Sequence, residues 1–230
     1  MSVDEHVAFE ERRTVERPSG LLLSVVVPVF NQEAGIAESV MTIRDAVADG
    51  LDGSFELIVV SDGSIDRTAE RVLATRDERV RTIHYDRNLG KGYAVKLGAL
   101  EARGRYVAYI DADLDLDPTW LPSLVERAEE VGLDFAIGSK RHPDSVVDYP
   151  QRRRVYSWLY QQLVRLLFRL DVRDTQVGLK VFRREVAEQV LPLLLVKRFA
   201  FDLELLAVAR ALGFRRIEEL PIRLEYRFTG

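Results

Sequence analysis

The chain has 230 residues, of which 47% are hydrophobic and 30% are charged, and its formal net charge is −4 at pH 7. That length suits one domain with a large buried core, and the negative balance argues against a nucleic-acid partner bound through bulk electrostatics. The chain contains no cysteine, which excludes disulfides and thiolate metal sites, and no apolar run reaches the ~20 residues that a membrane-spanning helix needs.

Residues 1–20 mix both charge signs and are expected to form a frayed tail, ahead of a single domain over 21–230. In that domain, apolar runs alternate with amphipathic stretches. The predicted strands cover 21–28, 55–60, 80–85, 106–110 and 135–138, and the predicted helices cover 33–47, 65–75, 91–102 and 121–131. This alternation predicts an open, mostly parallel α/β sheet with helices on both faces. Such sheets bind ligands outside the carboxyl ends of their strands.

The predicted strand over 106–110 is followed by four carboxylates at alternate positions, beginning with Asp111. Alternate side chains of an extended backbone share a face, so Asp111, Asp113 and Asp115 are expected to converge. Crowded carboxylates repel one another, whereas Mg²⁺ or Mn²⁺ takes oxygen ligands and typically shares one or two carboxylates with substrate phosphates. The pattern therefore indicates either a metal site or a solvated loop that leads into the next helix, with Pro118 in its first turn.

Two other strand ends carry polar residues. Asp62 follows the second strand, and Gly63 suits a tight turn there. Residues 88–92 read Asn-Leu-Gly-Lys-Gly at a predicted helix N-terminus, where backbone N–H groups, the helix dipole and the Lys91 ammonium suit an anion. The segment is not a Walker A loop, and no Gly-x-Gly-x-x-Gly fingerprint of dinucleotide binding occurs. Together, at one edge of a sheet, these loops predict a ligand site.

Several short motifs follow one another in order along the chain. In the first half they are Pro-Val-Phe-Asn at 28–31, Asp-Gly-Ser-Ile-Asp at 62–66, Asn-Leu-Gly-Lys-Gly at 88–92 and Asp-Ala-Asp at 111–113. This set resembles the family 2 glycosyltransferases of GT-A fold. In the second half the motifs are Gly-Ser-Lys-Arg at 138–141, Asp-Thr-Gln-Val-Gly-Leu-Lys-Val-Phe at 174–182 and Phe-Ala-Phe-Asp-Leu-Glu-Leu at 199–205. These resemble the polyprenyl-phosphate (dolichyl-phosphate) hexosyltransferases, and the resemblance covers residues 21–228.

The resemblance implies roles for the matching positions. The residues that would bind the nucleotide-sugar donor are Pro28, Phe30, Gln32, Asp62, Lys91, Asp111, Ala112, Asp113, Lys197 and Arg227. Within that set, Asp62 would bond to the base, and Lys197 and Arg227 would face the diphosphate. Asp113 and Asp115 would hold Mg²⁺ or Mn²⁺, and the acceptor phosphate would meet Lys140, Arg153 and Ser157. The implied catalytic residues are Asp113, Arg153 and Arg227.

Two positions depart from the pattern of the family. Asp115 stands where relatives usually have Gln, so this metal site is expected to carry one more negative charge. Gln32 stands where the family typically has Glu directly after Asn, and Glu33 follows it. Which of Gln32 and Glu33 meets the ribose is therefore left open.

Residues 151–170 begin with an arginine cluster and continue with apolar and aromatic residues at helical spacing. Guanidinium groups bind phosphate oxygens in pairs, so the cluster suits a phosphate clamp. The remainder predicts an amphipathic helix that lies on an anionic bilayer surface. The alternative is a helix buried in the core or in a homo-oligomer.

The resulting hypothesis is an inverting transferase that moves a hexose from a UDP-glucose or GDP-mannose type of donor to a polyprenyl phosphate. The metal, with Lys197 and Arg227, would stabilise the departing diphosphate, and a phosphate monoester that is already dianionic at pH 7 needs no general base. We expect a peripheral location on the cytoplasmic face of the membrane. One alternative is a family 2 transferase with a soluble or polysaccharide hydroxyl acceptor, for which Asp111 or Asp115 would have to be the base. The other is a non-catalytic nucleotide-sugar binding module.

Overall fold

The computed structural model describes residues 20–147, 168, 170–198 and 200–224. Within this part of the chain, the main sheet has seven strands in the order β3-β2-β1-β4-β7-β5-β8, and β6 pairs with β9 separately. The strands are β1 (Leu21–Val29), β2 (Ser54–Asp62), β3 (Val80–Tyr85), β4 (Tyr106–Ile110), β5 (Phe135–Ser139), β6 (Val146–Val147), β7 (Leu179–Arg183), β8 (Ile217–Pro221) and β9 (Arg223–Leu224). The helices are α1 (Ile36–Gly50), α2 (Thr68–Leu73), α3 (Lys91–Leu100), α4 (Trp120–Val131), α6 (Arg184–Val190) and α7 (Phe201–Ala211), with a 3₁₀ turn over Leu191–Leu193.

The predicted mostly parallel α/β sheet is confirmed. β1 pairs in parallel with β2 and β4, β2 with β3, and β5 with β8. The exception is β7, which lies between β4 and β5 and runs antiparallel to both. Its register pairs Leu179 with Ile110, so the first residue of β7 lies beside the last residue of β4. The segment that precedes β7 therefore reaches the edge at which the parallel strands end.

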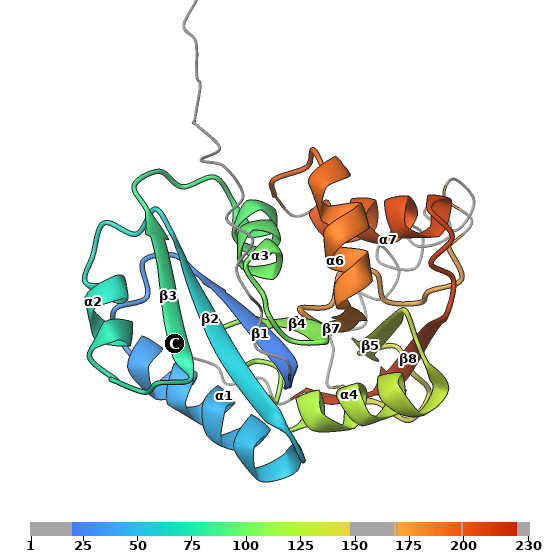
Figure 1. Ribbon diagram of the computed structural model, residues 1–230, viewed down its shortest axis with the longest axis horizontal. Helices are drawn as coiled ribbons and strands as arrows, with labels where there is room; N and C mark the ends of the chain where they lie inside the picture. Colours follow the sequence, from blue (N-terminus) through green and yellow to red (C-terminus); the bar gives the residue numbers. More distant parts are fainter. Residues whose placement is uncertain (1–19, 148–167, 169, 199, 225–230) are drawn as a thin grey trace, which may run out of the picture.

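Helices cover both faces of the sheet, as expected. α3, α6 and α7 lie on one face, and α1, α2 and α4 lie on the other (Figure 1). All five residues of β4 and all five of β5 are buried. Strands covered on both faces must be apolar along their whole length rather than at alternate positions. That requirement explains the near-continuous apolar runs in these strands.

Two helices begin later than expected. α1 begins at Ile36 rather than at residue 33, and α2 begins at Thr68 rather than at residue 65. The N–H of Glu33 ahead of α1, and those of Ile65 and Arg67 ahead of α2, donate to side chains of the neighbouring loop instead of entering a helix. α4 begins at Trp120, so Pro118 precedes its first turn and does not occupy it.

The amphipathic segment predicted over 151–170 lies almost entirely outside the described residues, as does most of the predicted tail. At its end, Phe168 is helical and exposed, and Leu170 is buried. Among the helices that the structure describes, none is both long and apolar enough to cross a bilayer.

Candidate functional site

The loops that follow β1, β2, β3 and β4 meet at one edge of the sheet, together with the segment that precedes β7. Two direct contacts join three of these loops, those after β1, β3 and β4. The side-chain amide of Gln32 donates to the carbonyl of Ala112 at 3.4 Å, and the ammonium of Lys91 lies 2.5 Å from Oδ1 of Asp111. Residues from the loops after β1, β3 and β4 thus form one cluster, as the strand-end argument predicted.

The loops after β1 and β2 brace each other. The N–H groups of residues 31, 32 and 33 donate in order to Ser64 Oγ, Thr68 Oγ1 and Asp66 Oδ2, at 3.0, 2.8 and 3.0 Å. In return, Asn31 Oδ1 accepts the N–H of Ile65 at 2.9 Å. These hydrogen bonds fix the loop that presents Phe30, whose side chain is 49% exposed. Ser64, Asp66 and Thr68 were missed as site residues, because in the sequence they look like caps of their own helix.

Asp62 is buried and holds the loop after β3. Its Oδ1 accepts the Tyr85 hydroxyl at 2.8 Å and the N–H of Leu89 at 2.7 Å, and its Oδ2 accepts the N–H of Gly90 at 2.9 Å. Burial and the Asp62 carboxylate both raise the pKa of Tyr85, which keeps its hydroxyl a donor. Asp62 therefore shapes the loop that leads into Lys91. The contact of Asp62 with a nucleobase stays a prediction.

The ion pair of Lys91 and Asp111 depends on a glycine. A Cβ at Gly178 would collide with Oδ2 of Asp111 and would lie only 2.9 Å from its Cγ and 3.4 Å from Nζ of Lys91. Gly178 therefore lets the segment before β7 pack directly on the pair. Burial raises the pKa of the Asp111 carboxyl, and the Lys91 ammonium opposes that rise.

The expectation that Asp111, Asp113 and Asp115 converge along an extended backbone is wrong. β4 ends at Ile110, and Leu114 has a φ of 58°, so the chain turns at once. Asp113 is exposed and accepts the N–H of Asp115 at 3.1 Å, whereas Asp111 is held by Lys91. In the described part of the chain, no three acidic or histidine side chains gather as a metal-binding group.

The donor set of this turn nevertheless fits Mg²⁺ or Mn²⁺. Asp113 and Asp115 offer hard carboxylate oxygens within one tight turn. Mg²⁺ is usually held in this way, by one or two carboxylates with the remaining positions filled by substrate phosphates and water.

The remaining predicted residues divide into two groups. Lys140 directly follows β5, and its N–H donates to Oδ2 of Asp174 at 3.1 Å. The backbone carbonyl of Lys197 accepts the N–H of Tyr93 at 3.2 Å, and its ammonium lies 5.7 Å from the centre of the Tyr93 ring, which puts Lys197 beside the first turn of α3. Arg153, Ser157 and Arg227 lie outside the described residues, and their roles stay predictions.

Comparisons of the sequence connect this geometry with known proteins. The glycosyltransferase AglD of Haloferax volcanii is 37% identical over 219 residues, which are 94% of this chain and 35% of that protein. A dolichyl-phosphate beta-glucosyltransferase of Dictyostelium discoideum is 31% identical, over 84% of this chain and 63% of its own length. A dodecaprenyl-phosphate galacturonate synthase of Rhizobium johnstonii is 32% identical, over 78% of this chain and 53% of its own length. The chain thus spans between about a third and two thirds of these three relatives.

The fold matches that of solved glycosyltransferases. Two structures of glucosyl-3-phosphoglycerate synthase from Mycobacterium tuberculosis superpose with TM-scores of 0.66 and 0.67 at 24% identity, over 91% of this chain and 73% of each neighbour. Both contain Mn²⁺, one with UDP and one with UDP-glucose. Residues 24–191 of this chain match the Glycosyl transferase family 2 domain. This match covers well over half of the chain, which therefore belongs to glycosyl transferase family 2.

Proposed function

We propose that this chain transfers a hexose from a nucleotide-diphosphate sugar to a polyprenyl phosphate. The observation that carries the proposal is the cluster at the sheet edge, where the Lys91–Asp111 pair lies beside the Asp113 turn and the loop after β1. An ammonium at a helix N-terminus next to paired carboxylates suits a diphosphate with its metal. The relatives named as dolichyl-phosphate and dodecaprenyl-phosphate enzymes support the choice of acceptor.

In the proposed reaction the donor diphosphate would lie between the Asp113 turn and the loop that carries Lys197. Asp113 and Asp115 would hold Mg²⁺ or Mn²⁺, which as a Lewis acid stabilises charge on the departing diphosphate. Lys197 is exposed beside the first turn of α3, where its ammonium can reach the same phosphates. Arg227 is proposed to help it.

The acceptor phosphate would attack without help from a base. A phosphate monoester has a second pKa near 6 and is largely dianionic at pH 7. A hydroxyl acceptor, in contrast, needs a base to take its proton. Asp111 and Asp115 would be the candidates for that role, but the Asp111 carboxylate is already committed to Lys91 at 2.5 Å, and Asp115 would be committed to the metal. This pairing favours the phosphate acceptor, and catalysis would depend mainly on positioning and electrostatics.

The direct test is an assay of nucleotide release. UDP-glucose and GDP-mannose are each incubated with the protein and Mn²⁺, with and without a polyprenyl phosphate. We expect release of one nucleotide to depend on the lipid, together with a glycosylated lipid product. Release that depends instead on a soluble hydroxyl acceptor would contradict the proposal, and so would nucleotide binding with no transfer to any acceptor.

Arg153→Ala should raise the KM for polyprenyl phosphate about tenfold or more and leave the KM for the donor nearly unchanged. The guanidinium is proposed to bind the acceptor phosphate in pairs of hydrogen bonds, so Arg153→Lys should also be impaired. Steady-state kinetics with each substrate varied in turn measures both constants. Arg215→Ala is the matched control, because it removes an exposed arginine at the opposite edge of the sheet. An unchanged acceptor KM in both Arg153 variants would assign the clamp elsewhere.

We also propose that the active-site edge contacts an anionic membrane surface. Leu193, Leu195 and Val196 are exposed between α6 and α7, Leu195 by 83%, and Lys197 and Arg198 follow them directly. The loop is fixed in place: the Glu204 carboxylate accepts the N–H groups of Leu195 and Val196 at 2.8–3.1 Å. Exposed apolar side chains beside basic ones suit the boundary between acyl chains and anionic headgroups. The cytoplasmic side of the membrane and a homo-oligomer stay predictions.

The double variant Leu193→Glu with Leu195→Glu should lower co-sedimentation with phosphatidylserine-containing liposomes about tenfold or more, because apolar insertion is lost and headgroup repulsion is added. Added salt should weaken binding of the wild type. The double variant Leu73→Glu with Leu212→Glu is the control, because it makes the same charge change in exposed leucines at the ends of α2 and α7, near where β3 and β8 start. Equal sedimentation of both double variants and the wild type would contradict this contact surface.

A further inference from the structure

A buried ion pair lies in the core on the α7 side of β4. Lys180 of β7 is completely buried, Asp202 in the first turn of α7 is 4% exposed, and Nζ of Lys180 lies 2.6 Å from Oδ1 of Asp202. The hydroxyl of Tyr109, from β4, donates to the same carboxylate oxygen. A buried ion pair is weak evidence for stability, because the cost of removing two charges from water offsets their attraction. The contacts of this pair suggest another role.

The first contact leads to Gly178. Nζ of Lys180 also donates to the carbonyl of Val177 at 2.7 Å. That carbonyl belongs to the peptide group whose nitrogen is the N–H of Gly178. Lys180 therefore orients the peptide that packs on the Asp111 carboxylate, at a position where no Cβ could fit.

The second contact leads to Asp111 along β4. Tyr109 precedes Asp111 by two residues, and the hydroxyl of Tyr109 is tied to Asp202. Burial and the Asp202 carboxylate raise the pKa of Tyr109, so its hydroxyl keeps its proton and remains a donor. The end of β4 and the start of β7 are thus held by one carboxylate oxygen.

A third connection, made by neighbours of Asp202 and not by the pair itself, joins α7 to the helix that Lys91 begins. The loop that precedes α7 carries Lys197, whose carbonyl accepts the N–H of Tyr93 in the first turn of α3. A Cβ at Gly92 would lie 2.5 Å from Cβ of Phe201, the first residue of α7, so the two helix N-termini pack closely. Each of the segments that carry Asp111, Gly178 and Lys91 thus contacts Asp202 or its neighbour Phe201.

We propose that Lys180, Asp202 and Tyr109 are positioning residues that set the geometry of the Lys91–Asp111 pair. They act through the peptide of Gly178, the end of β4 and the start of α7, and need not touch the substrate. The inference rests on the proposed function only in that the edge at Asp111 binds the nucleotide of the donor. A role in positioning predicts that loss of the cluster impairs nucleotide binding and turnover in a protein that remains folded.

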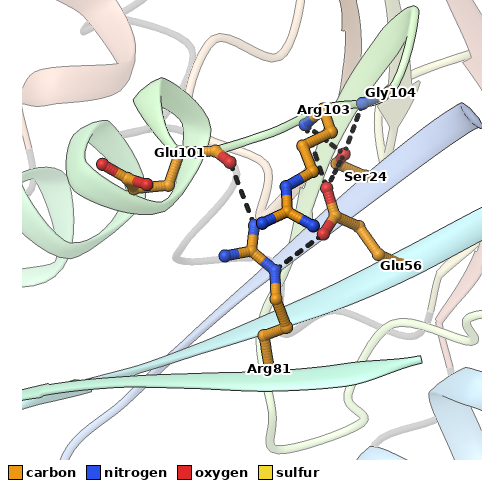
Figure 2. Close-up of polar contacts among 6 residues, drawn as sticks. All are labelled: Ser24, Glu56, Arg81, Glu101, Arg103 and Gly104. Atoms are coloured by element: carbon orange, nitrogen blue, oxygen red, sulfur yellow. Dashed lines mark hydrogen bonds and ion pairs between the residues drawn. The ribbon is translucent and has the colours of Figure 1, made fainter. Parts of the chain in front are cut away.

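The chain contains a second buried polar cluster that serves as a control. Glu56 accepts the hydroxyl of Ser24 at 2.8 Å, the N–H of Arg103 at 2.9 Å and Nε of Arg81 at 2.8 Å (Figure 2). The hydroxyl of Ser24 in turn accepts the N–H of Gly104 at 2.8 Å. Ser24, Glu56 and Arg81 lie in the first halves of β1, β2 and β3, whereas the candidate site lies beyond the ends of these strands. This cluster has comparable hydrogen bonding and a buried carboxylate, although the Arg81 side chain is 29% exposed, and its residues lie away from the site.

The experiment compares two charge-removing double variants, Lys180→Met with Asp202→Asn and Glu56→Gln with Arg81→Met. Replacing both partners of a buried pair is often tolerated, whereas removing one leaves an uncompensated charge. Thermal unfolding gives Tm, calorimetry with UDP and GDP in Mn²⁺ gives Kd, and the transfer assay gives kcat. We expect Kd to rise and kcat to fall about tenfold or more for the Lys180 and Asp202 double variant. For the Glu56 and Arg81 double variant we expect Kd and kcat within about twofold of the wild-type values, when each protein is measured at the same number of degrees below its own Tm.

Tyr109→Phe provides a milder variant, because it deletes one hydroxyl and keeps the ion pair. We expect a wild-type Tm with a lowered kcat. Wild-type Kd and kcat in a folded Lys180 and Asp202 double variant would overturn the inference. If that variant does not fold, wild-type Kd and kcat in Tyr109→Phe would overturn it instead. A wild-type chain that binds a nucleotide but does not use polyprenyl phosphate would contradict only the proposed function, and a chain that binds neither nucleotide would overturn both.

Discussion

Asp113→Ala should abolish sugar transfer, with kcat lowered by about 10³-fold or more. Asp113 is exposed at the first turn after β4. One of its carboxylate oxygens accepts the N–H of Asp115, which leaves the carboxylate accessible to a metal ion. A bound divalent cation lowers the barrier to departure of a diphosphate by several kcal/mol, so loss of a main ligand removes most of that effect. The measurement is nucleotide release at saturating donor and acceptor over a range of Mn²⁺ and Mg²⁺ concentrations.

Two neighbouring variants serve as controls for Asp113→Ala. Asp117→Ala removes an exposed carboxylate from the same segment, whose side chain accepts the N–H of Thr119 at 2.9 Å, and activity should remain close to that of the wild type. Asp115→Gln restores the residue that the family usually has, so activity should persist with weaker metal affinity. Full turnover in excess chelator would contradict the metal requirement.

Gly178→Ala should weaken donor binding and turnover together, by about 10²-fold in kcat/KM. The added Cβ would overlap the Asp111 carboxylate, so either Asp111 leaves Lys91 or the segment before β7 moves outward. A displacement of about 1 Å in a positioned group can cost a factor of this size. Calorimetry with UDP or GDP and kinetics with the donor varied give the two quantities, and Tm shows whether the fold persists.

Gly53→Ala is the matched substitution for Gly178→Ala. Its Cβ would meet Cδ2 of Leu22 at 2.8 Å, at the far end of a flexible side chain that can turn away, close to the start of β2. We expect this variant to keep wild-type activity with little change in Tm. Wild-type donor affinity in Gly178→Ala would show that the close packing on Asp111 has no functional role.

The strands of the first half could be predicted because strands that are buried on both faces consist mostly of apolar residues. β4 is apolar along its whole length and β1 is apolar except for Ser24, as expected for a sheet covered on both faces. β7 carries no such signal, because its sequence Leu-Lys-Val-Phe-Arg places a lysine in the core. Lys180 is accommodated there by Asp202, which lies 22 residues further along the chain, and a local pattern cannot reveal such a partner. The antiparallel direction of β7 is likewise a property of the sheet and not of its residues.

The candidate site could be predicted as a set of loops but not as a set of contacts. The rule that ligands bind beyond the carboxyl ends of strands located Asp62, Lys91 and Asp111 correctly at one edge. The alternation argument failed for Asp113 and Asp115, because it assumed that the extended backbone continued past Ile110. The pairing of Asp111 with Lys91 joins residues that are 20 positions apart and depends on Gly178, which no spacing rule connects with either.

The place of β7 between β4 and β5 also affects how the protein can be assembled during synthesis. β1, β2, β3 and β4 leave the ribosome first and can pair among themselves. β5 emerges next, but both of its sheet neighbours, β7 and β8, are made later. The nascent chain therefore carries an apolar strand with two unpaired edges for at least the 40 residues from Ser139 to Leu179. Unpaired apolar edges are sites of aggregation, so this interval is where the growing chain most needs protection by a chaperone.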